Sequence, residues 1–263
     1  MFFSYRFKCS CQNRSQTRIF SKNAILDSRN GFCVCSPELT FLQVADSFDL
    51  VRLVDLAYEL CGTYDTSTGN VRECAPLTTI AKLKTYVGKS EGVRGRKKAL
   101  RALRYAADGS ASPRETVLAM LLCLPHSLGG YRFALPQLNC RIDVSARAKA
   151  VTDKRFYRCD LYWSEAKLAV EYDSDLEHLG SRNAASDSSR RTALDALGVT
   201  VVTVTTLQIA SRVEMEHVAH RVARCLGKRL QYREPGFSSA NLRLRTKLLS
   251  SLQDEGVLTA LQC

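Results

Sequence analysis

The chain has 263 residues, of which 45% are hydrophobic; this is enough for a globular core and excludes a disordered chain. Lys and Arg outnumber Asp and Glu by 38 to 26, which gives a formal net charge of +12. Such a charge favours a polyanionic partner, and we expect a nucleic acid. The alternative is that the positive charge serves only solubility.

The sequence shows neither a secretory signal nor a membrane-spanning run. The first residues, MFFSYRFKCSCQ, lack the apolar run of a secretory signal, and the longest apolar run, Val117–Leu124, is too short to span a membrane. We therefore expect a cytoplasmic protein with no membrane partner. In that compartment the 11 cysteines are expected to be free thiols. The C-x-C pairs at Cys9 and Cys33 do not have the spacing of a zinc knuckle.

The first half of the chain divides into a short β-containing segment, residues 1–35, and a helical region, residues 36–109. Ser36-Pro37-Glu38 marks a helix start, because Ser is a good N-cap, Pro suits the first helical position and an acid favours the positive end of the helix dipole. Apolar residues then recur at helical spacing, which predicts two helices or one bent helix ending at Gly62. Pro76 is expected to open another helix, running to Val87.

A basic helix is predicted over Val93–Ala107. Its cations share one face because their spacing returns to the same side of a helix; they are Arg94, Lys97, Lys98, Arg101 and Arg104. One interpretation is a solvated face on a packed helix. The other is that these residues bind the phosphate backbone of DNA, in which case replacing Lys97, Lys98 and Arg101 by Glu should weaken binding and flatten its salt dependence.

A boundary is expected at Gly109-Ser110, before a second domain of residues 110–229. Its predicted elements, in chain order, are a helix from Ser112 to Leu124, a strand from Asn139 to Val144, a hairpin, a helix from Ala184 to Leu197, a strand over residues 199–204 and a helix from Leu207 to Leu226. This order predicts an α/β fold, an α/β/α sandwich with a mixed central sheet, preceded by the mostly helical region. Residues 230–263 form a basic tail with one amphipathic helix whose partner the sequence does not reveal.

The hairpin carries a group of acidic residues. Its two runs of aromatic and β-branched residues, Tyr157–Trp163 and Lys167–Asp173, flank a polar break. If Asp160 lies opposite Glu171, then Asp160, Glu171 and Asp173 share one face, since strand side chains alternate. Grouped carboxylates repel, so either one is protonated or pairs with Arg191, or the group binds a hard cation such as Mg²⁺ or Mn²⁺. We favour the cation, with Asp160 and Glu171 as ligands.

Glu115 has a local explanation of its own. It stands three residues after Ser112, and this spacing predicts a capping box at the start of a helix.

The order of several residues along the chain resembles that of a bacterial domain family. These residues are Glu115, Gln137, Asp160, Glu171-Tyr-Asp173, His178, Asp187 with Arg190 or Arg191, and Gly198-Val-Thr-Val-Val. That family is the very-short-patch-repair-endonuclease-like branch of the PD-(D/E)XK nuclease superfamily, and the resemblance covers Ala111 to Lys228. It implies a restriction-endonuclease-like fold and metal-dependent cleavage of DNA.

The resemblance also implies roles for single residues. Asp160 and Glu171 would hold the metal, Glu115 would be a further acid and His178 would lie beside the site. The superfamily's Lys, two residues after the second acid, is Asp173 here, as is usual in this branch, and we expect Arg191 to supply the positive charge instead. The branch generally has Asp-Gly where this chain has Asp173-Ser174.

The segment Ser36–Tyr105 is similar to the helical part of AbiEi-type antitoxin proteins. These residues and resemblances imply one of two functions. The first is a Mg²⁺-dependent DNA endonuclease with Glu115, Asp160, Glu171, Asp173, His178 and Arg191 at its site. The alternative is a DNA-binding regulator of the AbiEi type that does not cut. The oligomeric state stays open, with a homo-oligomer as one expectation.

Overall fold

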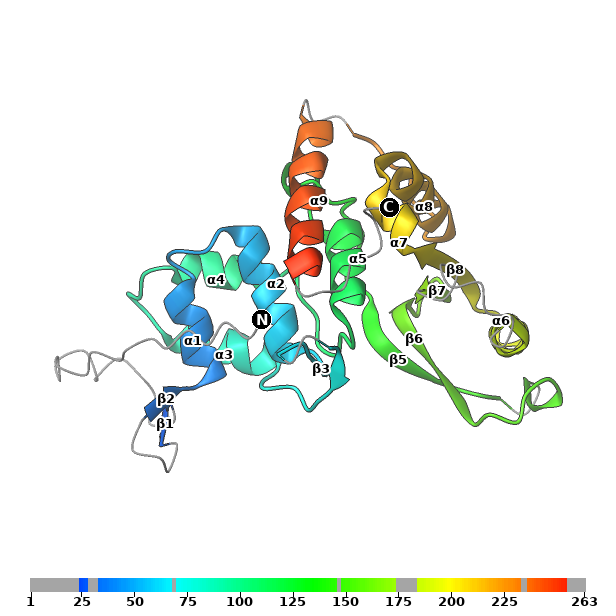
Figure 1. The fold of residues 1–263 in the computed structure, drawn as a ribbon, viewed down its shortest axis with the longest axis horizontal. Coiled ribbons are helices and arrows are strands. Elements are labelled where there is room, and N and C mark those ends of the chain that lie inside the picture. The colour runs from blue at the N-terminus through cyan, green and yellow to red at the C-terminus, as the bar shows by residue number, and fades with distance from the viewer. Residues whose placement is uncertain are drawn as a thin grey trace.

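The structure is a computed structural model, and it describes residues 24–27, 33–67, 70–145, 148–173, 184–232 and 236–254 (Figure 1). The part before residue 36 contributes a small antiparallel pair, β1 (Ile25–Asp27) and β2 (Cys33–Cys35). The cysteines within the described residues are all free thiols, as predicted.

The helical region begins as the sequence predicts. Helix α1 (Pro37–Val44) starts after Ser36, whose side chain accepts a hydrogen bond from the backbone N–H of Leu39. A separate helix, α2 (Leu50–Cys61), is capped by Asp49 and ends at Gly62, so the two-helix alternative is confirmed. A two-stranded pair, β3 (Tyr64–Asp65) and β4 (Arg72–Glu73), follows.

The next two helices are shorter than predicted. Helix α3 (Ile80–Lys89) begins after Thr79 rather than at Pro76, because the Thr79 side chain caps it and Asp108 accepts the N–H of Ile80. Helix α4 (Arg96–Ala102) begins after Gly95, which has φ of +79°. A Cβ at Gly95 would lie 2.6 Å from the backbone nitrogen of Asp46, so this close contact requires glycine and delays the helix.

The second half of the chain forms a mixed α/β arrangement around one sheet. After α5 (Pro113–Cys123) and a short 3₁₀ turn η1 (His126–Leu128), the strands are β5 (Gln137–Asp143), β6 (Phe156–Trp163), β7 (Leu168–Asp173) and β8 (Thr200–Thr205). The turn η2 (Ala148–Ala150) lies between β5 and β6. The sheet order is β5-β6-β7-β8, antiparallel except for the parallel pair β7–β8.

Helices cover both faces of this sheet. Helix α5 and helix α8 (Arg212–Cys225) pack on the face that carries Leu161, Val170 and Val202, in the main hydrophobic core. Helix α6 (Ala184–Ala196) packs through Ala193 and Leu194 on the other face, in a smaller core. The predicted helix over 207–226 is in fact two helices, α7 (Thr206–Ala210) and α8, because Ser211 breaks the run and caps α8.

The C-terminal helix α9 (Phe237–Asp254) has the partner that the sequence did not reveal. Its buried face, which includes Leu244 and Leu248, packs on α5 and on η1. Asn241 on the same helix donates a hydrogen bond to the carbonyl oxygen of Gly129. In Figure 1, α9 lies between the helices α1–α4 and the pair α7 and α8. The main core contains residues of α1–α5, of the sheet and of α7, α8 and α9. It therefore crosses the predicted boundary at residue 109.

The described helices include none that combines the length and the apolar character needed to cross a membrane.

Candidate functional site

The strand acids meet where the sheet twists. The register of β6 and β7 pairs Leu161 with Val170, and one further step along it places Asp160 opposite Glu171. Beside them in β5, Asn139 has φ of +46°, a left-handed conformation that Asn tolerates better than most residues. Asn139 and Asp160 therefore stand opposite each other at a break in the ladder.

This break turns β5 and β6 about their axis. Leu161 belongs to the core beneath α5, whereas Cys159, two residues earlier, belongs to the core beneath α6. On a regular strand, residues two apart face the same side. The acids therefore do not form the simple acidic face that the sequence predicts: Asp160 lies at the twist, and Glu171 lies on the α6 side.

Asp160 is held between the two strands. Its Oδ2 accepts a hydrogen bond of 2.8 Å from the backbone N–H of Tyr172. Burial, followed by the negative charges of Glu115 and Glu171, raises the pKa of Asp160 to about 8, against the smaller opposing effects of that hydrogen bond and Arg190. Burial and the neighbouring carboxylates therefore disfavour the charged form of Asp160, and a nearby cation would favour it.

Glu171 pairs with an arginine from α6. The Nη2 of Arg190 lies 2.5 Å from Oε2 of Glu171, and it also donates to the backbone carbonyl of Arg158. Both side chains of the ion pair are largely buried, with exposures of 28% for Arg190 and 14% for Glu171. The other oxygen of Glu171, Oε1, is buried and has no hydrogen-bond partner.

Glu115 approaches the acids from α5. Its capping role is confirmed in part: the N–H of Glu115 donates to Oγ of Ser112, but the Glu115 carboxylate accepts from the N–H of Ala111 instead of that of Ser112. Asn139 also donates to this carboxylate, at 2.9 Å. Burial raises the pKa of Glu115, and the charge of Glu171 adds to the shift, while these hydrogen bonds oppose it.

The remaining residues predicted for this site are Asp173, Arg191 and His178. Asp173 is at the end of β7, two residues beyond Glu171, and pairs in register with Thr205. Arg191 is exposed and donates to Oγ1 of Thr203, so Arg190 rather than Arg191 contacts the acids. His178 and Ser174 lie outside the described residues, and so does the side chain of Asp187.

The basic helix is partly structural. Lys98 donates to the backbone carbonyls of Asp46 and Phe48, at 3.0 and 2.7 Å, and so holds the loop after α1. The remaining four cations, Arg94, Lys97, Arg101 and Arg104, are exposed. Only Lys97 and Arg101 lie within the observed helix α4.

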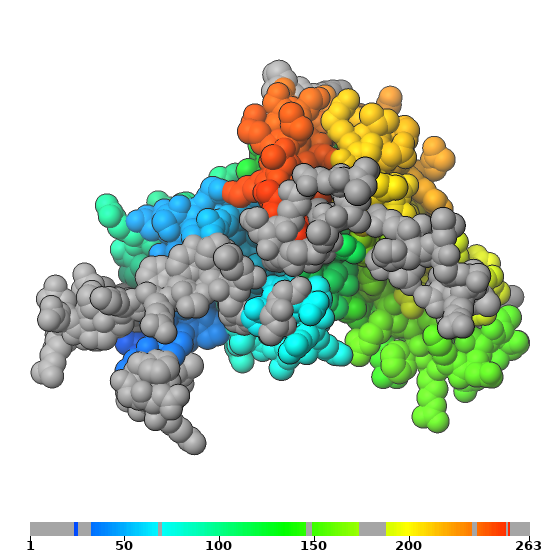
Figure 2. Space-filling view, in the orientation of Figure 1, coloured from blue at the N-terminus to red at the C-terminus, as the bar shows by residue number. Residues whose placement is uncertain are grey.

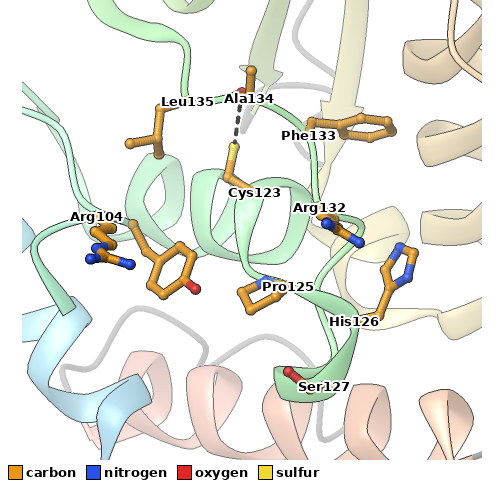
Figure 3. Close-up of a pocket in the computed structure, with 10 residues that line it drawn as sticks. Arg104, Cys123, Pro125, His126, Ser127, Arg132, Phe133, Ala134 and Leu135 are labelled. Atoms are coloured by element: carbon orange, nitrogen blue, oxygen red, sulfur yellow. Dashed lines mark hydrogen bonds between the residues drawn. The ribbon is translucent and has the colours of Figure 1, made fainter. Parts of the chain in front are cut away.

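A separate pocket of about 500 Å³ lies between the end of α4 and η1 (Figure 3). Arg104 lines it on one side, and His126 and Arg132 lie on the other side of the view. The Sγ of Cys123, at 3.6 Å from the carbonyl of Ala134, forms part of its wall. None of the acids described above lines this pocket.

The acid cluster has a donor set that suits a hard cation coordinated by few protein ligands. The described part of the chain contains no group of three or more His, Cys, Asp and Glu side chains arranged to hold a metal ion. Mg²⁺ commonly takes only one or two carboxylates from the protein and completes its shell with water and substrate phosphates. The unpartnered Oε1 of Glu171 and the costly burial of Asp160 fit that pattern.

Sequence reasoning missed two members of this cluster. Asn139 was expected only as the start of a strand, and Arg191 was chosen instead of Arg190 as the cation of the site. An Asn at a strand position is an available signal, because Asn is uncommon in strands and tolerates left-handed backbone.

No family model, no curated protein and no solved structure matches this chain. The described residues define an α/β protein with a four-stranded mixed sheet and a buried acidic cluster at its twist.

Proposed function

We propose that the chain is a metal-dependent DNA endonuclease that hydrolyses phosphodiester bonds and has a restriction-endonuclease-like fold. The observation that carries this proposal is the pair Asp160 and Glu171, two neighbouring, partly buried carboxylates of which one has a raised pKa and the other an unpartnered oxygen. A divalent cation would offset both costs.

Asp160 and Glu171 would hold the cation, Mg²⁺ or Mn²⁺, whose chemistry is to activate water and to neutralise charge on the phosphate. The chain's own groups keep the two carboxylates in place. The N–H of Tyr172 orients Asp160, and Arg190 orients Glu171 through Oε2, whereas Oε1 is buried without a hydrogen bond. Glu115, fixed by Ala111 and Asn139, adds negative charge from α5.

Arg190 would supply the positive charge that we expected from Arg191. Its guanidinium is the cation paired directly with the acids, and it is planar and permanently charged, which suits contact with a phosphate oxygen. Asp173 and His178 remain proposals as further site residues.

The test is nicking of supercoiled plasmid with and without Mg²⁺. The wild type is expected to nick only with the metal, and both Asp160→Asn and Glu171→Gln should reduce the rate at least a hundredfold because each removes a ligand charge. Glu165→Gln, which changes an exposed acid in the turn of the same hairpin, is the matched control and should cleave normally. Equal cleavage by folded Asp160→Asn protein would refute the proposal.

Metal binding has a readout that does not depend on cleavage. Mn²⁺ should raise the melting temperature of the wild type, because a ligand bound only by the folded state stabilises it, and should not raise that of Asp160→Asn.

One observation favours the alternative, a non-catalytic DNA-binding regulator of the AbiEi type. Arg190 already neutralises Glu171, so a fold with this pair can be stable without metal. This alternative predicts DNA binding in EDTA, no cleavage by the wild type and no stabilisation by Mn²⁺.

A further inference from the structure

Beyond the twist at Asn139 and Asp160, β5 and β6 continue as a two-stranded ribbon. Its paired residues run from Cys140–Cys159 to Asp143–Phe156. The ladder between β6 and β7 covers only residues 161–163 of β6, so the ribbon extends past β7. Figure 1 shows it projecting from the body at the end opposite α1–α4, and in Figure 2 it forms the green outer edge of the molecule.

The two faces of this ribbon differ. Tyr157, Cys159 and Val144 are buried beneath α6, so that face is fixed to the body. The alternate residues are exposed, and they are Arg141, Asp143, Phe156 and Arg158. The ribbon is therefore a rigid support for one exposed, mainly basic face.

Two arginines stand directly opposite each other on that face. Arg141 pairs in register with Arg158, and like charges directly opposite on neighbouring strands are destabilising. Asp143 forms an ion pair with Arg141 at 2.8 Å. Among the described residues no carboxylate pairs with Arg158. An uncompensated cation beside a second cation is suited to an anionic partner.

The surrounding sequence adds to this charge. Residues 141–158 contain six Lys or Arg and two Asp. The exposed cations next to the ribbon's end are Lys149, Lys154 and Arg155. The charge lies along an elongated element and not in a closed pocket, so it fits a polymer of phosphates better than a single small anion.

The ribbon also adjoins the acid cluster. Arg158 precedes Asp160 by two residues, a distance of about 7 Å along a strand. The backbone carbonyl of Arg158 holds Arg190, which in turn holds Glu171. A phosphate backbone bound along the ribbon would therefore run toward Asp160 at the twist of the sheet.

We propose that the exposed face of the β5–β6 ribbon, carrying Arg141 and Arg158, docks in the major groove of double-stranded DNA and directs one strand toward the acid cluster. The major groove of B-form DNA accommodates a two-stranded β-ribbon. The proposal rests on the proposed function for the identity of the polymer, and it adds the duplex form and the surface that binds it.

The exposed aromatic ring does not favour a single strand. The guanidinium carbons of Arg141 and Arg158 lie 4.2 and 5.9 Å from the centroid of the Phe156 ring. The ring therefore stacks with the protein's own cations and is not a free platform for unpaired bases. An RNA duplex is also disfavoured, because its major groove is too deep and narrow to admit such a ribbon.

The experiment measures binding of the full chain to a fluorescent 20-base-pair DNA duplex in EDTA over a series of salt concentrations. Arg141→Gln/Arg158→Gln is expected to weaken binding at least tenfold and to lower the slope of log affinity against log salt by about two, since each lost phosphate contact removes about 0.9. The matched control is Arg224→Gln/Arg243→Gln, which removes two exposed cations from α8 and α9 and should leave the slope unchanged.

An unchanged slope in the ribbon variant, or an equal loss in the control, would overturn the proposal. So would equal or tighter binding of the wild type to the single strand, or to an RNA duplex of the same sequence. Lys154→Gln/Arg155→Gln provides a second variant at the ribbon's end, with an expected loss in the same direction. Binding is measured without metal. A chain that binds DNA through the ribbon but does not nick plasmid would therefore contradict the proposed endonuclease activity and leave the proposed DNA-binding surface supported.

Discussion

Asp160 shows how far the environment of one residue can change its chemistry. It is nearly buried, two other carboxylates lie close to it, and a single backbone N–H and Arg190 oppose their effect. The pattern of acids in the hairpin predicted that these groups would need compensation. The position of Asp160 between the strands buries this carboxyl beside other acids, and its pKa is raised to about 8.

This raised pKa predicts a pH dependence of stability in EDTA. The folded chain keeps the Asp160 proton up to about pH 8, whereas the unfolded chain loses it near pH 4. Between these values the unfolded state binds fewer protons, so the free energy of unfolding should fall as the pH rises, by an amount on the order of a few kcal/mol. Asp160→Asn should reduce this fall and leave a smaller part that comes from Glu115, whose pKa burial also raises; urea unfolding at pH 5 and pH 8 would measure both. A variant with the same pH dependence as the wild type would contradict the assignment, and Glu165→Gln is the control.

Arg190 and Arg191 make a matched pair of neighbours with different surroundings. Arg190→Ala would leave Glu171 buried without its cation and should cost roughly 2–3 kcal/mol of stability, less than for a fully buried pair because Arg190 is partly exposed. Arg191→Ala changes an exposed side chain and should cost less than about 0.5 kcal/mol. Chemical denaturation of the two variants would compare them, and equal losses would contradict the pairing. The sequence could not choose between them, because adjacent helical residues differ by about 100° and only the packing of α6 fixes which one faces the sheet.

At the scale of elements, α4 combines a structural and an exposed set of cations. Lys98 ties α4 to the loop after α1, and Lys97 next to it is exposed. Lys98→Ala should therefore lower the free energy of unfolding by about 1–2 kcal/mol, and Lys97→Ala should leave it nearly unchanged. Thermal or urea unfolding of both variants would check this, and equal stabilities would show that the Lys98 contacts contribute nothing.

The exposed cations of the same region remain a prediction for DNA binding. Charge reversal of Lys97, Lys98 and Arg101 would mix a loss of binding with a loss of stability, because Lys98 is structural. Arg94→Glu/Lys97→Glu/Arg101→Glu isolates the exposed set, and it should weaken duplex binding and flatten its salt dependence. A salt slope equal to that of the wild type would show that these residues form a solvated face and do not contact DNA.

At the scale of the whole molecule, one core joins the helical region to the sheet. Helix α5 packs on α2, on the sheet and on α9, and Lys247 of α9 forms an ion pair with Asp49 at the start of α2. The regions before and after residue 109, which the sequence predicts as two domains, therefore share one buried core.

A shared core predicts one cooperative unfolding transition. Trp163, the only tryptophan, lies in β6 and reports on the sheet through its fluorescence, whereas far-ultraviolet circular dichroism reports mainly on the helices. The two signals should change at the same urea concentration, because neither part can unfold without exposing the core of the other. Midpoints that differ would show two independent domains.

Local chemistry by itself determined much of the secondary structure. Capping by Ser36 and Ser112, the alternation in the hairpin and the breaks at Gly62 and Gly198 depend on neighbours in the chain, so the starts of α1 and α5 and the limits of β6 and β7 were predicted nearly to the residue. Contacts between distant segments set the rest. The close contact between Gly95 and the backbone of Asp46 shortens α4. The twist at Asn139 moves Asp160 out of the strand face that the sequence predicts it to share with Glu171. Packing also places α9 on α5 and turns Arg190, not Arg191, toward the acids, because these outcomes depend on how elements meet in space, which no local pattern encodes.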